Sequence, residues 1–115
     1  MPPKHDTIFG RIIRREAEAK IVYETEDVIA FRDIAPKAPV HVLVCPKEPV
    51  PNIMEVTDPL LIGKVMMACA EVVRIEGIED RGCRIILNTG IEAGQTVYHL
   101  HAHVMGGRRF EWPPG

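Results

Sequence analysis

Two stretches of the chain repeat their apolar residues at helical spacing. Ile8 and Ile12 lie four positions apart after Asp6, which is suited to cap a short helix. A longer pattern begins after Asp58, with Pro59 at the first helical position, and ends at Gly77. Its apolar residues recur at intervals of three and four and predict one long core helix; they are Leu61, Val65, Ala68, Val72 and Ile75.

Other stretches alternate between apolar and polar residues or are continuously apolar, as strands are. Segments 21–24 and 28–32 predict a hairpin across a three-residue turn. A nearly continuous apolar run over 41–45 predicts a central strand covered on both faces. Segment 84–87 is a fourth predicted strand, and the alternation over 98–105 predicts a fifth. This order of elements indicates an α+β fold, with an antiparallel sheet of about five strands, one long helix and one short helix.

The last predicted strand places three histidines on one face, His99, His101 and His103. The opposite face, expected to pack against a helix, comprises Tyr98, Leu100, Ala102 and Val104. Buried imidazoles require hydrogen-bond partners, an anionic ligand or a metal. The spacing therefore allows a hydrogen-bonded or solvated histidine face, a zinc site, or a nucleophilic imidazole flanked by two that bind and protonate a phosphate ester. The third interpretation fits best, because a catalytic zinc site also needs second-shell partners and the acids lie mostly in helical and loop stretches.

Further motifs accompany the histidines in a fixed order along the chain. They are Asp6–Gly10 (DTIFG), Phe31–Pro36 (FRDIAP), Ala38–His41 (APVH), Gly94–Tyr98 (GQTVY) and Trp112–Gly115 (WPPG). Together with His99–Met105, these blocks resemble the histidine triad (HIT) superfamily, in its Hint branch of histidine triad nucleotide-binding proteins. The resemblance covers nearly the whole chain. It implies a single HIT domain and a homodimer whose two sheets join into one. We expect a flexible tail over 1–6 and the domain over 7–115.

The resemblance also implies a reaction. The Hint branch is similar to purine nucleoside phosphoramidases, which cleave P–N bonds of AMP or GMP linked to amines, including lysyl-AMP, through a nucleotidyl-histidine. His101 would be the nucleophile, and His103 would donate to the phosphate and to the departing group. His99 and His41 would fix the tautomer and orientation of His101, although a lone histidine at a strand end is usually structural. The expected chemistry needs no cofactor and no metal.

A purine nucleotide is the expected ligand, and the resemblance assigns most of its contacts. Asp33 would accept the ribose hydroxyls, although an aspartate at a strand end also bonds turn amides. The position of Asn88 at a strand end allows it to form a turn or to bind phosphate. The resemblance favours the phosphate ligand. Thr96 stands where serine is usual, and it would offset oxygen charge together with Asn88 and the amides of 94–97. The full predicted nucleotide site comprises Ile8, Phe9, Ile12, Phe31, Asp33, Ile34, Asn88, Gly94, Gln95, Thr96, Val97, His101 and His103.

The end of the chain, 108–115, is expected to reach the partner subunit. Trp112, Pro113 and Pro114 are more apolar than the residues of a free chain end usually are. The resemblance implies that Trp112 lies at the leaving-group side of the partner's site. A related HIT branch hydrolyses dinucleoside polyphosphates, and the C-terminal Trp-Pro-Pro-Gly argues against that assignment. A nucleotide-binding interaction or regulatory protein with slow or incidental hydrolysis stays open as an alternative.

Composition adds three constraints. The chain has 115 residues, enough for one domain, and its net charge of −2 gives no basic footprint for nucleic acid. No apolar run approaches the roughly 18 residues of a membrane span, so no membrane partner is expected. Cys45, Cys69 and Cys83 are predicted to be free buried thiols in a reducing compartment. The expected location is therefore the cytoplasm, with the nucleus also accessible at this size.

Overall fold

A computed structural model describes residues 7–115 of the chain. The flexible tail predicted over 1–6, and Asp6 as a helix cap, lie outside the described residues. The cap of the first helix, α1 (Ile8–Ile13), is Thr7, whose side-chain hydroxyl accepts a hydrogen bond from the Gly10 amide at 3.1 Å. Threonine serves this position because its oxygen satisfies an amide that has no partner within the helix.

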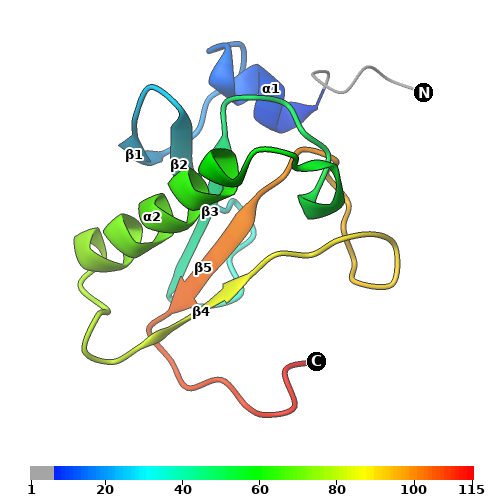
Figure 1. Cartoon of the computed structure of the whole chain (residues 1–115). Helices are drawn as coiled ribbons and strands as arrows, with labels where there is room; N and C mark the ends of the chain where they lie inside the picture. Colours follow the sequence, from blue (N-terminus) through cyan, green and yellow to red (C-terminus); the bar gives the residue numbers. More distant parts are fainter. Residues whose placement is uncertain (1–6) are drawn as a thin grey trace.

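The predicted antiparallel sheet of five strands with one long and one short helix is confirmed (Figure 1). The strand order is β1-β2-β3-β5-β4, with antiparallel pairing between all neighbours. The remaining elements are β1 (Ile21–Glu24), β2 (Val28–Arg32), β3 (Val40–Pro46), the short 3₁₀ helix η1 (Ile53–Glu55), α2 (Pro59–Ile75), β4 (Cys83–Ile86) and β5 (Ala102–Gly106).

The central strand β3 separates two apolar cores, which explains its continuous apolar sequence. Val42 and Val44 point to the α2 side, where they pack with Val65, Val72 and Val104. The opposite side carries the smaller core beside α1, made of Phe9, Ile12, Ile29, Phe31, Leu43 and Cys45. Figure 1 shows α2 lying across the sheet and α1 at one end. The face beside α1 is therefore only partly covered by a helix.

The boundaries of α2 follow the sequence prediction, but its buried stripe differs at one end. At its start, the Asp58 carboxylate caps the helix by accepting a hydrogen bond from the Leu60 amide at 2.9 Å. Beyond its end, Gly77 adopts a left-handed backbone conformation with φ +70°. Ile75 was expected in the core and is 48 % exposed, because the chain turns away after Glu76. Glu76 accepts two hydrogen bonds from the Arg32 guanidinium, an ion pair that the sequence did not predict.

The histidine-rich strand is shorter than predicted. Strand β5 begins at Ala102 instead of Tyr98, because the Leu100 amide donates to the Val50 carbonyl of a preceding loop at 2.6 Å. Ala102 and Val104 pack toward α2 as expected, whereas Tyr98 is exposed.

The prediction that all three cysteines are buried is wrong for Cys83. Cys45 and Cys69 are buried and free, and burial raises the pKa of each thiol to about 12, which keeps both protonated. Cys83 is free but exposed, because it lies at the start of the edge strand β4.

Across residues 7–115, neither α-helix combines the length and apolarity that a membrane span requires.

Replacing Ile29 by alanine is expected to destabilise the fold by about 3 kcal/mol, because this fully buried side chain fills the smaller core and would leave a cavity. Urea unfolding followed by circular dichroism measures the loss. Ile91, which is 87 % exposed, provides the matched control, and Ile91→Ala should change the free energy of unfolding by less than about 0.5 kcal/mol. Equal effects of the two substitutions would contradict the core assignment.

Candidate active site

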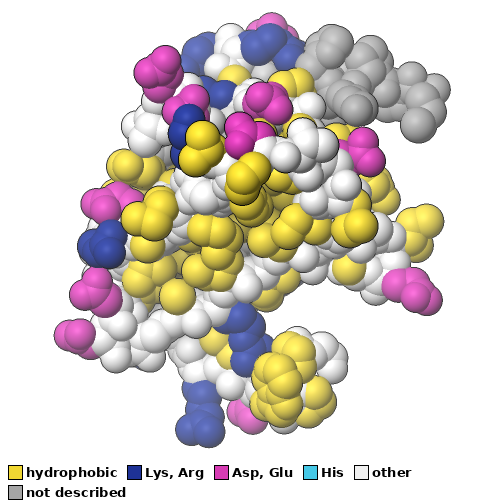
Figure 2. Space-filling model, viewed as in Figure 1, with side chains coloured by type: hydrophobic (Ala, Val, Ile, Leu, Met, Phe, Trp, Pro, Cys, Tyr) yellow, Lys and Arg dark blue, Asp and Glu magenta, His cyan; other side chains and the backbone are white. Residues whose placement is uncertain are grey.

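Four histidines gather on the sheet face that α1 only partly covers. Alternation along β3 puts His41 on the same side as Leu43, and Leu43 is the register partner of His103 on β5. His101 precedes β5, and its ring lies 5.1 Å from that of His103. Among the described residues, no histidine side chain is visible on the opposite, α2 side of the molecule in Figure 2. The sheet therefore carries its histidines and its long helix on different faces.

His101 has one ring nitrogen fixed by the backbone. Its Nδ1 lies 2.7 Å from the carbonyl oxygen of His99, and a carbonyl only accepts hydrogen bonds, so Nδ1 carries the proton. The neutral ring then has its lone pair on Nε2, for which residues 7–115 offer no hydrogen-bond partner. The ring meets Phe9 edge-on at 4.8 Å, which fixes the plane of the imidazole. This arrangement leaves an oriented nitrogen nucleophile.

His41 and His103 form a second hydrogen-bonded unit. The amide of Lys37 donates to His41 Nδ1 at 2.9 Å, so the proton of the neutral His41 ring is on Nε2. That nitrogen lies 2.9 Å from His103 Nδ1, which must then be the acceptor. His103 therefore carries its proton on Nε2 and can donate it to a ligand.

His99 anchors the histidine segment to the sheet. Its Nε2 donates to the carbonyl of Pro46, at the end of β3, at 2.7 Å. Its Nδ1 has no hydrogen-bond partner in the described part of the chain, and the residue is 1 % exposed. The sequence prediction gave His99 and His41 the task of orienting His101. In the structure the backbone carbonyl of His99 performs it, and the His41 ring contacts His103.

Burial keeps all four imidazoles neutral at pH 7. Desolvation lowers the pKa of His41, His99 and His101 below the ordinary value. The pKa of His103 falls furthest, to about 4, because desolvation is reinforced by the neighbouring His101 and His41 rings. Asp33 opposes this shift, but its effect is the smallest of those acting on His103. A neutral histidine pair suits both a nucleophile and a hydrogen-bond donor.

Asp33 lies between the histidines and the next turn. Its Oδ1 accepts from the Ala35 amide at 2.8 Å, and its Oδ2 lies 3.3 Å from His41 Nε2. Each oxygen keeps a further lone pair, so ribose hydroxyls could still be accepted. Asp33, His41 and His103 also offer three possible metal ligands within 4.8 Å of one another. His41 and His103 already hydrogen-bond to each other, and Asp33 Oδ2 lies 3.3 Å from the same His41 Nε2, so the arrangement is also explained by proton sharing.

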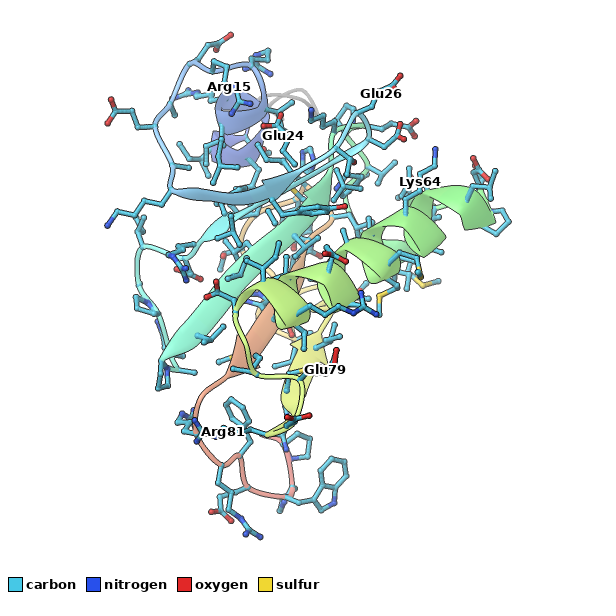
Figure 3. All side chains as sticks on the ribbon, turned by 90° about the vertical axis from the view of Figure 1, so that its left-hand side faces the viewer. Arg15, Glu24, Glu26, Lys64, Glu79 and Arg81 are labelled. Carbon is cyan, nitrogen blue, oxygen red and sulfur yellow. The ribbon has the colours of Figure 1, made fainter. Side chains whose placement is uncertain are left out.

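A cavity of about 910 Å³ opens beside Asp33. Ile12 and Ile34 line it together with the segment that follows α1, residues 15–21. Arg15 ties this segment to the sheet edge through Glu24 of β1, and the two side chains meet in Figure 3. Of the predicted base-side residues, Phe9, Ile12 and Phe31 are buried in the smaller core, whereas Ile8 and Ile34 are exposed.

The predicted phosphate-side residues lie in the loop between β4 and β5. Asn88 follows β4 by two residues, and Ile86 of β4 lies opposite His103. Thr96 and Gly94 are exposed, and Val97 packs against the smaller core. Gln95 is buried, because its amide bridges the carbonyls of Pro51 and Val97 and accepts from Gly90 and Asn52. The Gln95 side chain therefore holds the loop together.

The backbone groups on which the histidines depend leave no signal in the sequence. The amide of Lys37 and the carbonyls of Pro46 and His99 each fix one ring. Every residue carries such groups, so no residue type marks them in a sequence.

Acidification is expected to destabilise the protein. The unfolded chain takes up protons near the ordinary histidine pKa of about 6.5, whereas folded His103 does so near 4, so stability is complete above pH 6.5 and is lost as the pH falls toward 4. The free energy of unfolding should fall by roughly 2 kcal/mol for His103 alone between about pH 7.5 and pH 5. Urea unfolding at the two pH values, repeated with His103→Asn, measures the slope. Unchanged or higher stability at the lower pH would refute the neutral histidine cluster.

Three comparisons place this geometry among known proteins. The HIT domain family model matches residues 14–110. An uncharacterized HIT-like protein of Synechococcus elongatus is 52 % identical over 112 residues, which cover 96 % of this chain and 97 % of the relative.

Two solved structures share the fold. A HIT family hydrolase from Legionella pneumophila superposes with a TM-score of 0.92 at 37 % identity, covering 96 % of this chain and 100 % of that one. A histidine triad nucleotide-binding protein from Candida albicans gives a TM-score of 0.83 at 25 % identity, covering 94 % and 83 %. The chain belongs to the HIT domain family, as a protein with the HIT fold that is similar to HIT family hydrolases.

Proposed function

We propose that the protein is a purine nucleoside phosphoramidase, which hydrolyses the P–N bond between a nucleoside 5′-phosphate and an amine without a metal. The observation that carries the proposal is the pairing of an oriented, unprotonated Nε2 on His101 with a protonated Nε2 on His103. One imidazole can attack phosphorus while its neighbour donates to the phosphate. The hydrolase and nucleotide-binding descriptions of solved relatives support this direction.

The proposed reaction proceeds in two displacements. His101 Nε2 forms a bond to the α-phosphorus, the P–N bond to the amine breaks, and a proton from His103 goes to the amine. Water then attacks the nucleotidyl-histidine, His103 takes the proton from the water, and the bond to His101 breaks. The products are the free amine and the nucleoside monophosphate. An amine is a good leaving group here because it is neutral once protonated.

His103 takes up a proton from solvent when the substrate binds. Its pKa is about 4 in the chain as described, so the ring is neutral at pH 7. An anionic phosphate at Nε2 favours the protonated form and raises this pKa, because opposite charges attract strongly at a buried site. The site therefore becomes acidic when the phosphate binds.

The nucleoside is assigned to the side of the site that carries Asp33. The carboxylate would accept the ribose hydroxyls, and the neighbouring cavity is large enough for a purine. Ile12 and Ile34 line that cavity and offer apolar contact to the base. Asn88, Thr96 and the amides of 94–97 are assigned to the phosphate, since their loop precedes the histidines.

We also propose a homodimer in which the sheets of two copies join. Strand β4 lies at the edge of the sheet, so its outer side is free to pair with another strand. Leu60, Met67 and Ile75 on α2 are exposed, and Figure 2 shows apolar side chains spread across this face. The free thiols fit a reducing compartment, the cytoplasm or the nucleus.

His101→Asn is expected to reduce hydrolysis of an AMP phosphoramidate by roughly 10³-fold or more, because it removes the nucleophile. AMP binding should persist, since Asp33 and the cavity are unchanged. Mass spectrometry of the quenched wild-type reaction should show an AMP adduct on His101, and the variant should show none. Near wild-type turnover by the variant would refute the covalent mechanism.

Removing the tail is expected to change leaving-group preference. Trp112 is 82 % exposed, which leaves it available to a second subunit. Truncation after Glu111, and Trp112→Ala alone, should alter kcat/KM for bulky amines by roughly 3- to 10-fold and leave small amines on the same AMP nearly unaffected. Kinetics with both substrate sets on folded protein provide the measurement. An equal loss for all amines would indicate lost stability, and no change would exclude a role for Trp112.

A further inference from the structure

The start of the C-terminal tail packs tightly against the segment that joins β2 to β3. Gly107 follows β5 with φ +88°, and a Cβ atom there would lie 2.8 Å from Cβ of Pro39. Such a contact excludes a side chain, so the close approach of the two backbones depends on glycine. The segment approached in this way carries Asp33 at its start and leads into His41.

Arg108 extends this contact with hydrogen bonds. Its Nε and Nη2 both donate to the carbonyl of Lys37, at 3.3 and 3.1 Å. The guanidinium also lies 4.3 Å from the ring centroid of Phe110, which the guanidinium of Arg84 approaches at 5.2 Å. The Arg108 side chain therefore stacks on Phe110 of the tail, which Arg84 of β4 also contacts, while it donates to the Lys37 carbonyl.

Lys37 connects Arg108 to the histidines. Its amide donates to His41 Nδ1 at 2.9 Å. The rest of the segment is fixed by short local bonds, from the Lys37 ammonium to the Ala35 carbonyl and from the Ala35 amide to Asp33. This segment meets the tail through the Arg108 hydrogen bonds and through the packing of Gly107 on Pro39. Arg108 holds the carbonyl of Lys37, and the Lys37 amide lies one residue's backbone torsions away, so Arg108 restrains the direction of that amide through the Lys37 backbone.

The Lys37 amide bears on the proton positions of two rings. While it donates to His41 Nδ1, the His41 proton is on Nε2, and His103 accepts at Nδ1. Without that donor, the 3.3 Å contact with the Asp33 carboxylate is what still favours a proton on His41 Nε2, and the ring can also place its proton on Nδ1. A neutral His103 facing that second tautomer would have to carry its proton on Nδ1 and would lose the Nε2 proton that faces the ligand.

We propose that Arg108 is a positioning residue for His103, acting through the backbone of Lys37 and through His41. It holds the tautomer that keeps a proton on His103 Nε2, although it contacts neither the reacting atoms nor the histidine rings. The catalytic consequence rests on the proposed function, whereas the tautomer consequence does not. The tail would then contribute to the site of its own subunit through Arg108.

The test measures the tautomers directly in the ligand-free protein. Long-range ¹H–¹⁵N spectra of the imidazoles report which nitrogen of His41 and His103 is protonated. In the wild type, Nε2 should be the protonated nitrogen of both rings. Arg108→Met, which keeps the stem and removes the donors, should shift both rings toward a mixture of tautomers. Arg108→Lys should move the spectrum back toward wild type, because it restores one charged donor.

Arg109→Met is the matched control. Arg109 is the exposed neighbour of Arg108, and its side chain has no hydrogen-bond partner within the described range. This variant removes the same charge and should leave both rings unchanged. Shifts of equal size in the two variants would overturn the proposal, as would an Arg108→Met spectrum identical to wild type. If Arg108→Met fails to fold, Arg108→Gln, a milder loss of donors, is held to the same criteria.

Turnover gives a second, separate measurement. With an AMP phosphoramidate, Arg108→Met should lower kcat roughly tenfold with KM little changed, because substrate contacts remain and a proton donor is misplaced. Absence of hydrolysis in the wild type would refute the proposed function, and the imidazole spectra would still decide the role of Arg108. Altered tautomers with normal kcat would limit that role to the resting protein and overturn its catalytic part.

Discussion

The desolvation of four imidazoles on one sheet face is the constraint on which the site depends. A buried charged ring is unfavourable, so each histidine is neutral and has one donor and one acceptor nitrogen. A neutral ring can exist in two tautomers with opposite functions. The protein selects between them with backbone groups, because the His99 carbonyl sets His101 and the Lys37 amide sets His41. The direction of each hydrogen bond therefore determines which histidine can attack and which can donate.

The architecture of the sheet makes these fixed hydrogen bonds possible. Strand β3 is covered by α2 on one face and by the smaller core on the other, so its backbone has little freedom. It supplies His41 at one end and the Pro46 carbonyl that anchors His99 at the other. Strand β5 pairs with β3 and places His103 beside Leu43. One rigid strand thus holds both ends of the histidine row.

The two ends of the site differ in how they are built. At one end, Ile12 of α1 and residues 15–21 line a cavity next to Asp33. On the other side, the tail is attached by arginine contacts, from Arg81 to Gly107, from Arg84 to Glu111 and from Arg108 to Lys37. Figure 3 shows Arg81 where the tail leaves the sheet. Arginine suits such attachments because one guanidinium can bond carbonyls and also stack on a ring such as Phe110.

The sequence by itself determined the order of the elements, the long helix and the residues of the histidine motif. Periodicity and capping residues are local properties, so Asp58, Gly77 and the apolar run of β3 could be interpreted without a structure. The start of β5, the exposure of Cys83 and the ion pair of Arg32 with Glu76 depended on neighbours distant in the chain. The same holds for the tautomers. The groups that select them are backbone amides and carbonyls, which every residue has, and only the tertiary structure decides which of them meets a histidine.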